Sequence, residues 1–281
     1  MSAYESFAIV GAGTLGILII EALAAKSVSL VVLSRPGSAT KTVPPSVKTV
    51  LVDYDDAAAV TAVLEENKID VVISTVAYEG LASQNSLVDA AKLAGVKLFV
   101  PSEFGFPTDG LTEGVLGAKG RFAAYLKSIN MPSTRIFTGA WTDWIPWLVD
   151  YANGGKVKVI GKGEAQVSFT SIADMAGFVA YVLTNLPPSE LEDRVLRIEG
   201  QRASLRDVAE QFKTEVVRVD SIGGDMGQIK TALQGLVEAG RGSSGWDGVK
   251  NAESTGNNAA GSANALWPGH HWESIKEVLN L

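Results

Sequence analysis

The chain has 281 residues, of which 46% are hydrophobic and 20% are charged, and its formal net charge is −7. This composition predicts a compact globular protein, and a negative charge without a cluster of Lys and Arg argues against nucleic acid as a partner. The absence of cysteine excludes disulfides, thiolate nucleophiles and cysteine-ligated metals. No secretory signal pattern or membrane-spanning apolar run is visible, so we expect a cytoplasmic protein that does not contact a membrane.

From residue 7 to about residue 140, short apolar runs alternate with stretches of helical periodicity. Buried strands that are each followed by a helix build a parallel sheet with helices on both faces. The sequence therefore predicts an α/β fold with a Rossmann-like, doubly wound parallel sheet. The expected strands cover residues 7–10, 30–33, 50–52, 71–74, 98–100 and 135–137, and the expected helices cover 14–26, 56–67, 83–94 and 114–129. The acidic turn after the third strand is predicted to cap the next helix: Asp53, Asp55 and Asp56.

A glycine pattern, "GAGTLG", follows the first strand directly and opens the first helix. This is the position at which a GxGxxG motif binds a dinucleotide. Its glycines would allow, in order, a tight turn, the approach of a pyrophosphate and close packing of helix on strand: Gly11, Gly13 and Gly16. The first N–H groups of the helix, with Thr14 and Leu15, would face the phosphates. An ordinary strand-to-helix turn is the alternative.

The end of the second strand favours NADP(H) over NAD(H). An NAD site carries a carboxylate here, whereas this chain has Ser34 and Arg35 in "LVVLSRPG". Arg35 can pair with a 2′-phosphate and Ser34 can donate a hydrogen bond to it. Lys41 in the following loop would add a second positive charge. The alternative is that Arg35 is an ordinary solvated loop residue.

One lysine shares the apolar face of the helix expected over residues 114–129. At helical spacing Leu116, Lys119 and Phe122 point the same way, whereas Arg121 points elsewhere. A lysine in a partly apolar cleft has a lowered pKa and can act as a general acid or base. The alternative is that its stem covers apolar surface while its amine reaches water.

Three tryptophans follow the sixth strand in "GAWTDWIPWLVDY". We expect Gly139, Trp141 and Trp144 to line a substrate pocket, because an aromatic wall suits a flat aromatic ligand. Core packing is the alternative for the tryptophans. For the adjacent His270 and His271 we predict a structural or surface role. No metal site is expected.

The alternation of strand and helix patterns changes after Trp147. The residues beyond it are predicted to form a smaller C-terminal α/β substrate lobe. A hairpin is expected over "KVKVIGKG" and "AQVSFTS", then a helix, "IADMAGFVAYVLTNL", and a strand, "RVLRIEG". A Ser-capped helix, "SLRDVAEQF", and a strand, "TEVVRVDSI", follow.

These patterns divide the chain into an NADP(H)-binding domain over residues 1–153 and a substrate-binding lobe over 154–281. The strand near residues 194–200 is a candidate for returning to the sheet of the first domain. Residues 240–268 are rich in Gly, Ser and Asn, which predicts either a mobile flap or a poorly ordered surface loop.

The most specific motif of the chain is "PSEFG" at residues 101–105, within "VKLFVPSEFGFPTDG". With the early glycines, the arginine after the second strand and the lysine that follows, it resembles the NmrA-like family. The similarity is to the isoflavone reductase-like branch, with its plant phenylcoumaran benzylic ether and pinoresinol-lariciresinol reductases, and to its fungal-type members. "LVDAAKLAGVKLF" and "VSFTSIADMAGFVAYVL" support the resemblance, which covers about residues 5–215.

The resemblance implies a Rossmann domain with a small substrate lobe, NADPH as hydride donor and a lysine general acid or base that falls on Lys119. It also implies that the ends of the fourth and fifth strands lie beside the nicotinamide, with Phe104 near the substrate as well. These residues are Ser74, Thr75, Val76, Pro101, Ser102, Glu103 and Phe104. Two features depart from the family pattern: plant members carry GxxGxxG, one residue longer than the motif here, and Gly120 follows Lys119 inside the helix.

We therefore expect an NADPH-dependent oxidoreductase that reduces a small aromatic secondary metabolite at an electrophilic carbon, as a monomer or a homodimer. Lys119 would handle the proton. Two alternatives stay open: an NADP(H)-sensing NmrA-like regulator without catalysis, and a non-redox isomerase or cyclase on the same fold.

Overall fold

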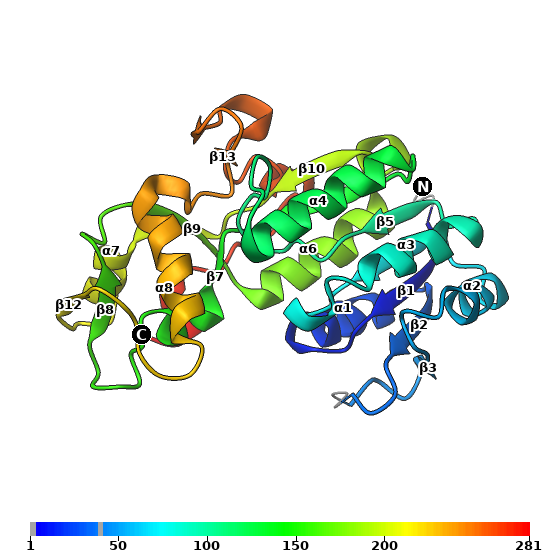
Figure 1. The fold of residues 1–281 in the computed structure, drawn as a ribbon, viewed down its shortest axis with the longest axis horizontal. Coiled ribbons are helices and arrows are strands. Elements are labelled where there is room, and N and C mark those ends of the chain that lie inside the picture. The colour runs from blue at the N-terminus through cyan, green and yellow to red at the C-terminus, as the bar shows by residue number, and fades with distance from the viewer. Residues whose placement is uncertain (1–3, 39–41) are drawn as a thin grey trace. The chain divides into compact units, whose positions relative to one another are not determined.

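The computed structural model describes residues 4–38 and 42–281, and the chain divides into two compact units (Figure 1). Both units take residues from the first 153 positions, and the domain boundary near residue 153 stays a prediction. The first unit takes in the chain up to Glu103, then Gly110–Ile136 and Met175–Leu196. The second unit takes in Phe104–Asp109, Phe137–Asp174 and Arg197–Leu281.

The first unit is built on a five-stranded parallel sheet in the order β3-β2-β1-β4-β5. β1 lies at the centre and is buried along its whole length. Because β2 and β4 flank β1 on opposite sides, the carboxyl ends of β1 and β4 meet at the switch point where ligands bind in such sheets. The strands are β1 (Ser6–Val10), β2 (Ser29–Ser34), β3 (Lys48–Leu51), β4 (Val71–Ser74) and β5 (Leu98–Val100).

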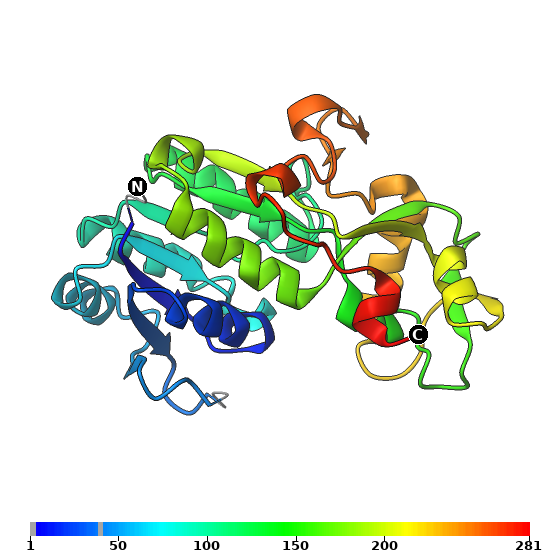
Figure 2. The ribbon, with the colours of Figure 1, turned by 180° about the vertical axis from the view of Figure 1, so that it is seen from behind.

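Helices cover both faces of this sheet. One face carries α2 (Ala57–Glu66), α3 (Gln84–Leu93) and α4 (Gly114–Ser128), whose apolar side chains share a core with Ala8 and Val10 of β1 (Figure 1). The opposite face carries α1 (Thr14–Ala24) and α6 (Ile172–Asn185) (Figure 2). This two-faced burial explains the continuous apolar runs in the strands.

A further pair of strands adjoins the sheet. β6 (Thr134–Phe137) pairs with β10 (Arg194–Arg197), and a parallel bridge between Phe99 and Ser133 joins the start of β6 to β5. The predicted α/β fold with a Rossmann-like parallel sheet is confirmed. The predicted strands and helices up to residue 137 agree with the observed ones to within two residues at each end.

The second unit contains three small sheets in the part of the chain that the structure describes, in the orders β11-β9-β7, β12-β8 and β13-β14. Its strands are β7 (Ala140–Trp141), β8 (Val157–Ile160), β9 (Gln166–Thr170), β11 (Gln201–Ser204), β12 (Val216–Val219), β13 (Trp246–Asp247) and β14 (Ala252–Glu253). Its helices are α5 (Ile145–Leu148), α7 (Leu205–Gln211), α8 (Gly227–Leu236) and α9 (Ile275–Leu279). As predicted, Ser204 caps α7 through its side chain.

The hairpin predicted from "KVKVIGKG" and "AQVSFTS" is wrong. β8 pairs in parallel with β12, whereas β9 pairs with β11 and β7. The turn between β8 and β9 is hydrogen-bonded to a distant residue: the N–H groups of Lys162 and Gly163 donate to the Glu238 carboxylate at 2.8 and 3.1 Å. The two strands that flank this turn therefore belong to different sheets, each formed with partners distant in the sequence.

The Gly-, Ser- and Asn-rich composition of residues 240–268 predicted a mobile flap or a poorly ordered surface loop. In the structure this segment is hydrogen-bonded to the rest of the second unit. The Ser244 N–H donates to Ser168 Oγ at 2.9 Å, and the Asn264 side-chain amide donates to the Glu199 carbonyl at 2.7 Å. β13 and β14 pair within this segment. Among the described residues, every helix is too short or too polar to cross a bilayer.

The acidic turn after β3 caps α2 through Asp56, whose carboxylate accepts a hydrogen bond from the Ala59 N–H at 3.0 Å. We expect Asp56→Ala to lower the free energy of unfolding by about 1 kcal/mol, because the N–H loses its partner. Urea denaturation measures this change. Asp55→Ala is the matched control, with an expected change below about 0.5 kcal/mol, and equal losses in the two variants would contradict the capping role.

Candidate active site

The turn between β1 and α1 depends on a close approach of backbone to backbone. Gly11 has φ +95°, in the left-handed region that favours glycine. A Cβ atom on Gly16 would lie 2.3 Å from the Gly11 carbonyl oxygen and 2.5 Å from Thr75 Oγ1. The Thr75 hydroxyl donates to the Gly11 carbonyl at 2.8 Å and lies 3.1 Å from that of Val10. These contacts fix α1 against both β1 and β4.

The N-terminus of α1 is open to a ligand. Gly13 stands at the N-cap position without a side-chain cap, is exposed, and a Cβ there would meet no atom within 4 Å. The first turn of α1 contains no acidic residue. Free N–H groups and this open space fit a pyrophosphate. Thr14 is half-buried and the Leu15 side chain is buried, so Leu15 can contribute only through its backbone.

The end of β2 presents an exposed guanidinium on an aromatic support. The guanidinium carbon of Arg35 lies 5.8 Å from the centre of the Tyr54 ring. The Tyr54 hydroxyl donates to the Leu33 carbonyl at 2.8 Å, and burial raises the pKa of Tyr54 to about 12, so the ring stays neutral. Ser34 is buried beside this edge. A supported, exposed guanidinium fits a 2′-phosphate; Lys41 lies outside the described residues.

The loops after β4 and β5 are joined by hydrogen bonds. Ser102 Oγ donates to the Val76 carbonyl at 2.8 Å, and the Ser102 N–H donates to Gln84 Oε1 at 2.9 Å. The hydroxyl of Ser74 is buried and has no hydrogen-bond partner among the described residues, which is unusual for a buried polar group. This edge of the sheet therefore carries an unsatisfied polar group close to Thr75.

Lys119 reaches from α4 to the turn after β5. Its Nζ donates to the Glu103 main-chain carbonyl at 2.7 Å. Burial lowers the pKa of the Lys119 amine, and the Glu103 carboxylate acts in the opposite direction. α4 continues through Gly120, Lys119 is half-buried, and Arg121 is exposed on another face. The amine is thus held at a fixed point and not left free in solvent.

The Glu103 side chain forms a buried ion pair. Its Oε1 lies 2.9 Å from Nε of Arg135 in β6, and the two side chains are 2% and 11% exposed. Glu103 therefore makes two contacts: its main-chain carbonyl accepts a hydrogen bond from Lys119, and its carboxylate pairs with Arg135.

In the second unit, three of the predicted substrate-contacting residues come together. The Trp141 indole donates to the Phe104 carbonyl at 2.6 Å, and the Trp141 and Trp144 rings are 4.8 Å apart. Phe104 is buried with φ +39°, and Trp144 is 42% exposed. Gly139 is buried, and a Cβ atom there would lie 2.1 Å from the Ser168 carbonyl oxygen. A residue with a side chain therefore does not fit at this position. Trp144 therefore offers an exposed aromatic face beside Trp141.

Two residues of the site were not predicted from the sequence: Tyr54 beneath Arg35 and Arg135 beside Glu103. A charged residue within the largely buried strand "TRIF" was the available signal for Arg135. For the histidines, His270 Nε2 lies 2.7 Å from the buried carboxylate of Asp174, which favours a structural role.

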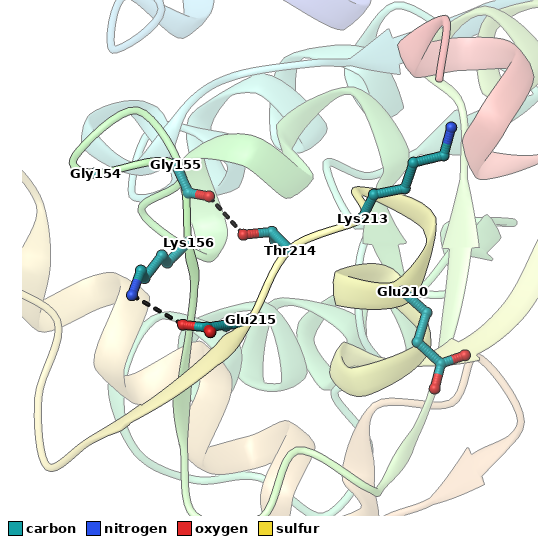
Figure 3. Close-up of a pocket in the computed structure, with 7 residues that line it drawn as sticks. All are labelled: Gly154, Gly155, Lys156, Glu210, Lys213, Thr214 and Glu215. Carbon is teal, nitrogen blue, oxygen red and sulfur yellow. Dashed lines mark hydrogen bonds and ion pairs between the residues drawn. The ribbon is translucent and has the colours of Figure 1, made fainter.

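A separate hollow of about 480 Å³ lies in the second unit (Figure 3). Thr214 Oγ1 donates to the Gly155 carbonyl at 2.6 Å, and Lys156 pairs with Glu215 at 2.9 Å. Its lining contains none of the predicted site residues: Gly154, Gly155, Lys156, Glu210, Lys213, Thr214 and Glu215. Residues 4–38 and 42–281 contain no group of three His, Asp or Glu side chains arranged to hold a metal ion.

Comparison with known proteins identifies the family. The model of the NmrA-like family matches residues 5–219. The chain belongs to the NmrA-like family. It is 30% identical over 217 residues to an oxidoreductase of Botryotinia fuckeliana, covering 70% of this chain and 71% of that protein. It is 33% identical over 157 residues to an isoflavone reductase homolog of Zea mays, where the match spans 52% of this chain and 49% of the relative.

Solved structures confirm the fold of this NmrA-like protein. Leucoanthocyanidin reductase from Vitis vinifera, in a binary complex with NADPH, superposes with a TM-score of 0.79 at 20% identity over 98% of both chains. An isoflavone reductase superposes with a TM-score of 0.79 at 17% identity over 99% of both chains. These structures show the fold alone; the sequence relatives, an oxidoreductase and an isoflavone reductase homolog, place the chain in the isoflavone reductase-like branch of oxidoreductases.

The glycines of the first turn give a paired prediction on stability. Gly16→Ala forces a methyl group into the Gly11 carbonyl and should lower the free energy of unfolding by about 1–3 kcal/mol. Gly13→Ala enters open space and should change it by less than about 1 kcal/mol. Thermal and urea denaturation measure both. A Gly16→Ala variant as stable as the parent protein would contradict the close approach.

Proposed function

We propose that the protein is an NADPH-dependent reductase of a small aromatic secondary metabolite. The observation that carries the proposal is the half-buried Lys119 amine, held 2.7 Å from the Glu103 carbonyl in the turn after β5. An oriented amine with a lowered pKa is suited to proton transfer. Membership of a branch that contains reductases supports this assignment.

The cofactor site that we propose lies at the carboxyl edge of the sheet in the first unit. The N–H groups at the start of α1, from Gly13 to Gly16, would hold the pyrophosphate, and Arg35 the 2′-phosphate, with Ser34 and Lys41 as further contacts. The residues of the first unit proposed to lie beside the nicotinamide are Ser74, Thr75, Val76 and Ser102. When bound, NADPH supplies a hydride. Solved structures of leucoanthocyanidin reductase and of a reductase with pinoresinol contain NADPH and NADP+, respectively.

Lys119 would move the proton in this reaction. Where an electrophilic carbon of the substrate gains a hydride, the Lys119 ammonium would give a proton to the substrate atom that gains negative charge. The Glu103 carbonyl accepts a hydrogen bond from either protonation state of the amine, because the neutral form still carries two N–H groups. The nitrogen therefore keeps its position when the proton leaves.

The proposed substrate class follows from the second unit. Trp144 presents an exposed aromatic face beside Trp141, which suits an aromatic ligand. Gly139 and Phe104 complete the set that we propose for substrate contact. We further propose that the protein acts in the cytoplasm, as a monomer or a homodimer.

Cofactor selectivity tests the role of Arg35. We expect Arg35→Gln to weaken NADPH binding about 10- to 100-fold, the effect of losing one or two charge-assisted hydrogen bonds, while NADH binding stays the same. Calorimetric titration measures both constants. Lys48→Gln removes a surface cation that pairs with Glu66 and serves as the control. Equal affinity of the parent protein for NADPH and NADH would overturn the assignment.

Turnover tests the role of Lys119. NADPH consumption with aromatic enones and benzylic ethers identifies a working substrate; Lys119→Ala should then lower kcat at least about 100-fold without altering NADPH affinity. Lys127→Ala, an exposed lysine on the same helix, should keep full activity. Full activity of Lys119→Ala would remove the proposed acid. NADPH binding without turnover of any substrate would favour a sensing regulator instead.

A further inference from the structure

The ion pair between Glu103 and Arg135 is not used in the reaction described above. Burying two charges removes their hydration, so an ion pair in this setting is weak evidence for a gain in stability. Its placement is more informative. The same residue that accepts a hydrogen bond from Lys119 through its carbonyl carries the buried carboxylate, 2.9 Å from Arg135 Nε.

We propose that Glu103 and Arg135 are positioning residues that set the protonation state of Lys119. This inference rests on the proposed function, in which Lys119 transfers the proton. The carboxylate favours the ammonium form of the lysine, and the guanidinium of Arg135 both keeps that carboxylate ionised and offsets part of its field.

Other charged groups on α4 and on the neighbouring α3 have different partners. On α3, Asp89 accepts from the Tyr125 hydroxyl at 2.7 Å, and the Lys92 amine donates to the Ile129 carbonyl. On α4 itself, Arg121 donates to the Thr112 carbonyl and Lys127 is exposed. Glu113, at the start of the helix, is exposed as well. The Glu103 carboxylate is the charge that opposes the effect of burial on Lys119.

The pair predicts an order of pKa values for Lys119. Glu103→Gln removes the carboxylate and leaves the buried Arg135 guanidinium without its anion. The remaining positive charge disfavours the ammonium form of Lys119, so the pKa of Lys119 should fall by about one unit. In Glu103→Gln/Arg135→Gln both charges are absent, so the pKa should lie between that of the single variant and that of the parent protein. The double variant has no unpaired buried charge and is expected to fold, because replacing both partners of a buried pair is tolerated.

The test is a 13C NMR titration of the whole protein labelled at the ε-carbon of lysine, with the Lys119 signal assigned by its loss in Lys119→Arg. The expected order of Lys119 pKa is parent, then double variant, then Glu103→Gln as the lowest. Asp89→Asn removes a carboxylate that faces α4 and is the control, with a smaller shift than Glu103→Gln. Arg135→Lys keeps the positive charge and should stay close to the parent.

Each outcome separates this inference from the proposed function. An unchanged Lys119 pKa in Glu103→Gln, or a lower value in the double variant than in the single one, overturns the role of the pair. Shifts in the expected order together with full turnover of Lys119→Ala would keep the role of the pair and reject the lysine as the proton donor. Where Lys119 is the donor, the limb of the pH–rate profile assigned to it moves with the NMR value in each variant.

Discussion

The close approach of α1 to the strands beneath it is the constraint on which the site depends. Gly16 packs against the Gly11 carbonyl and the Thr75 hydroxyl without room for a methyl group. This contact ties the helix to β1 and β4 at the switch point of the sheet. It also aims the uncapped N–H groups of α1 out of the carboxyl edge, where phosphate groups bind in this class of fold. The open space at Gly13 completes the arrangement.

The acid–base role proposed for Lys119 depends on the turn after β5. The Glu103 carbonyl positions the Lys119 amine, and its carboxylate is held by Arg135 from β6. The carbonyl and the carboxylate of Glu103 thus each have a partner, and the two contacts hold the turn in place. Because the turn follows a buried strand of the central sheet, the same sheet supports both the lysine and α1, the helix proposed to bind phosphate. Rigid support of this kind is what precise proton transfer requires.

The sheet of the first unit could be predicted because β1, β4 and β5 are buried on both faces and appear in the sequence as short apolar runs. The glycine motif predicted a phosphate site at Gly11, and the family resemblance placed Thr75 beside the same cofactor. The pair of Glu103 and Arg135 could not be foreseen, since a contact between residues 32 positions apart leaves no periodic trace. The second unit was harder for the same reason: β8 pairs with β12 and not with the adjacent β9.

The central claim is that the start of α1 and the end of β2 together hold a 2′-phosphorylated dinucleotide. A crystal structure of the protein with NADP+ tests it most directly. We expect pyrophosphate oxygens within hydrogen-bonding distance of the N–H groups that follow Gly13, and the 2′-phosphate against the guanidinium of Arg35. A pyrophosphate bound away from α1, or a 2′-phosphate without contact to Arg35, would contradict it.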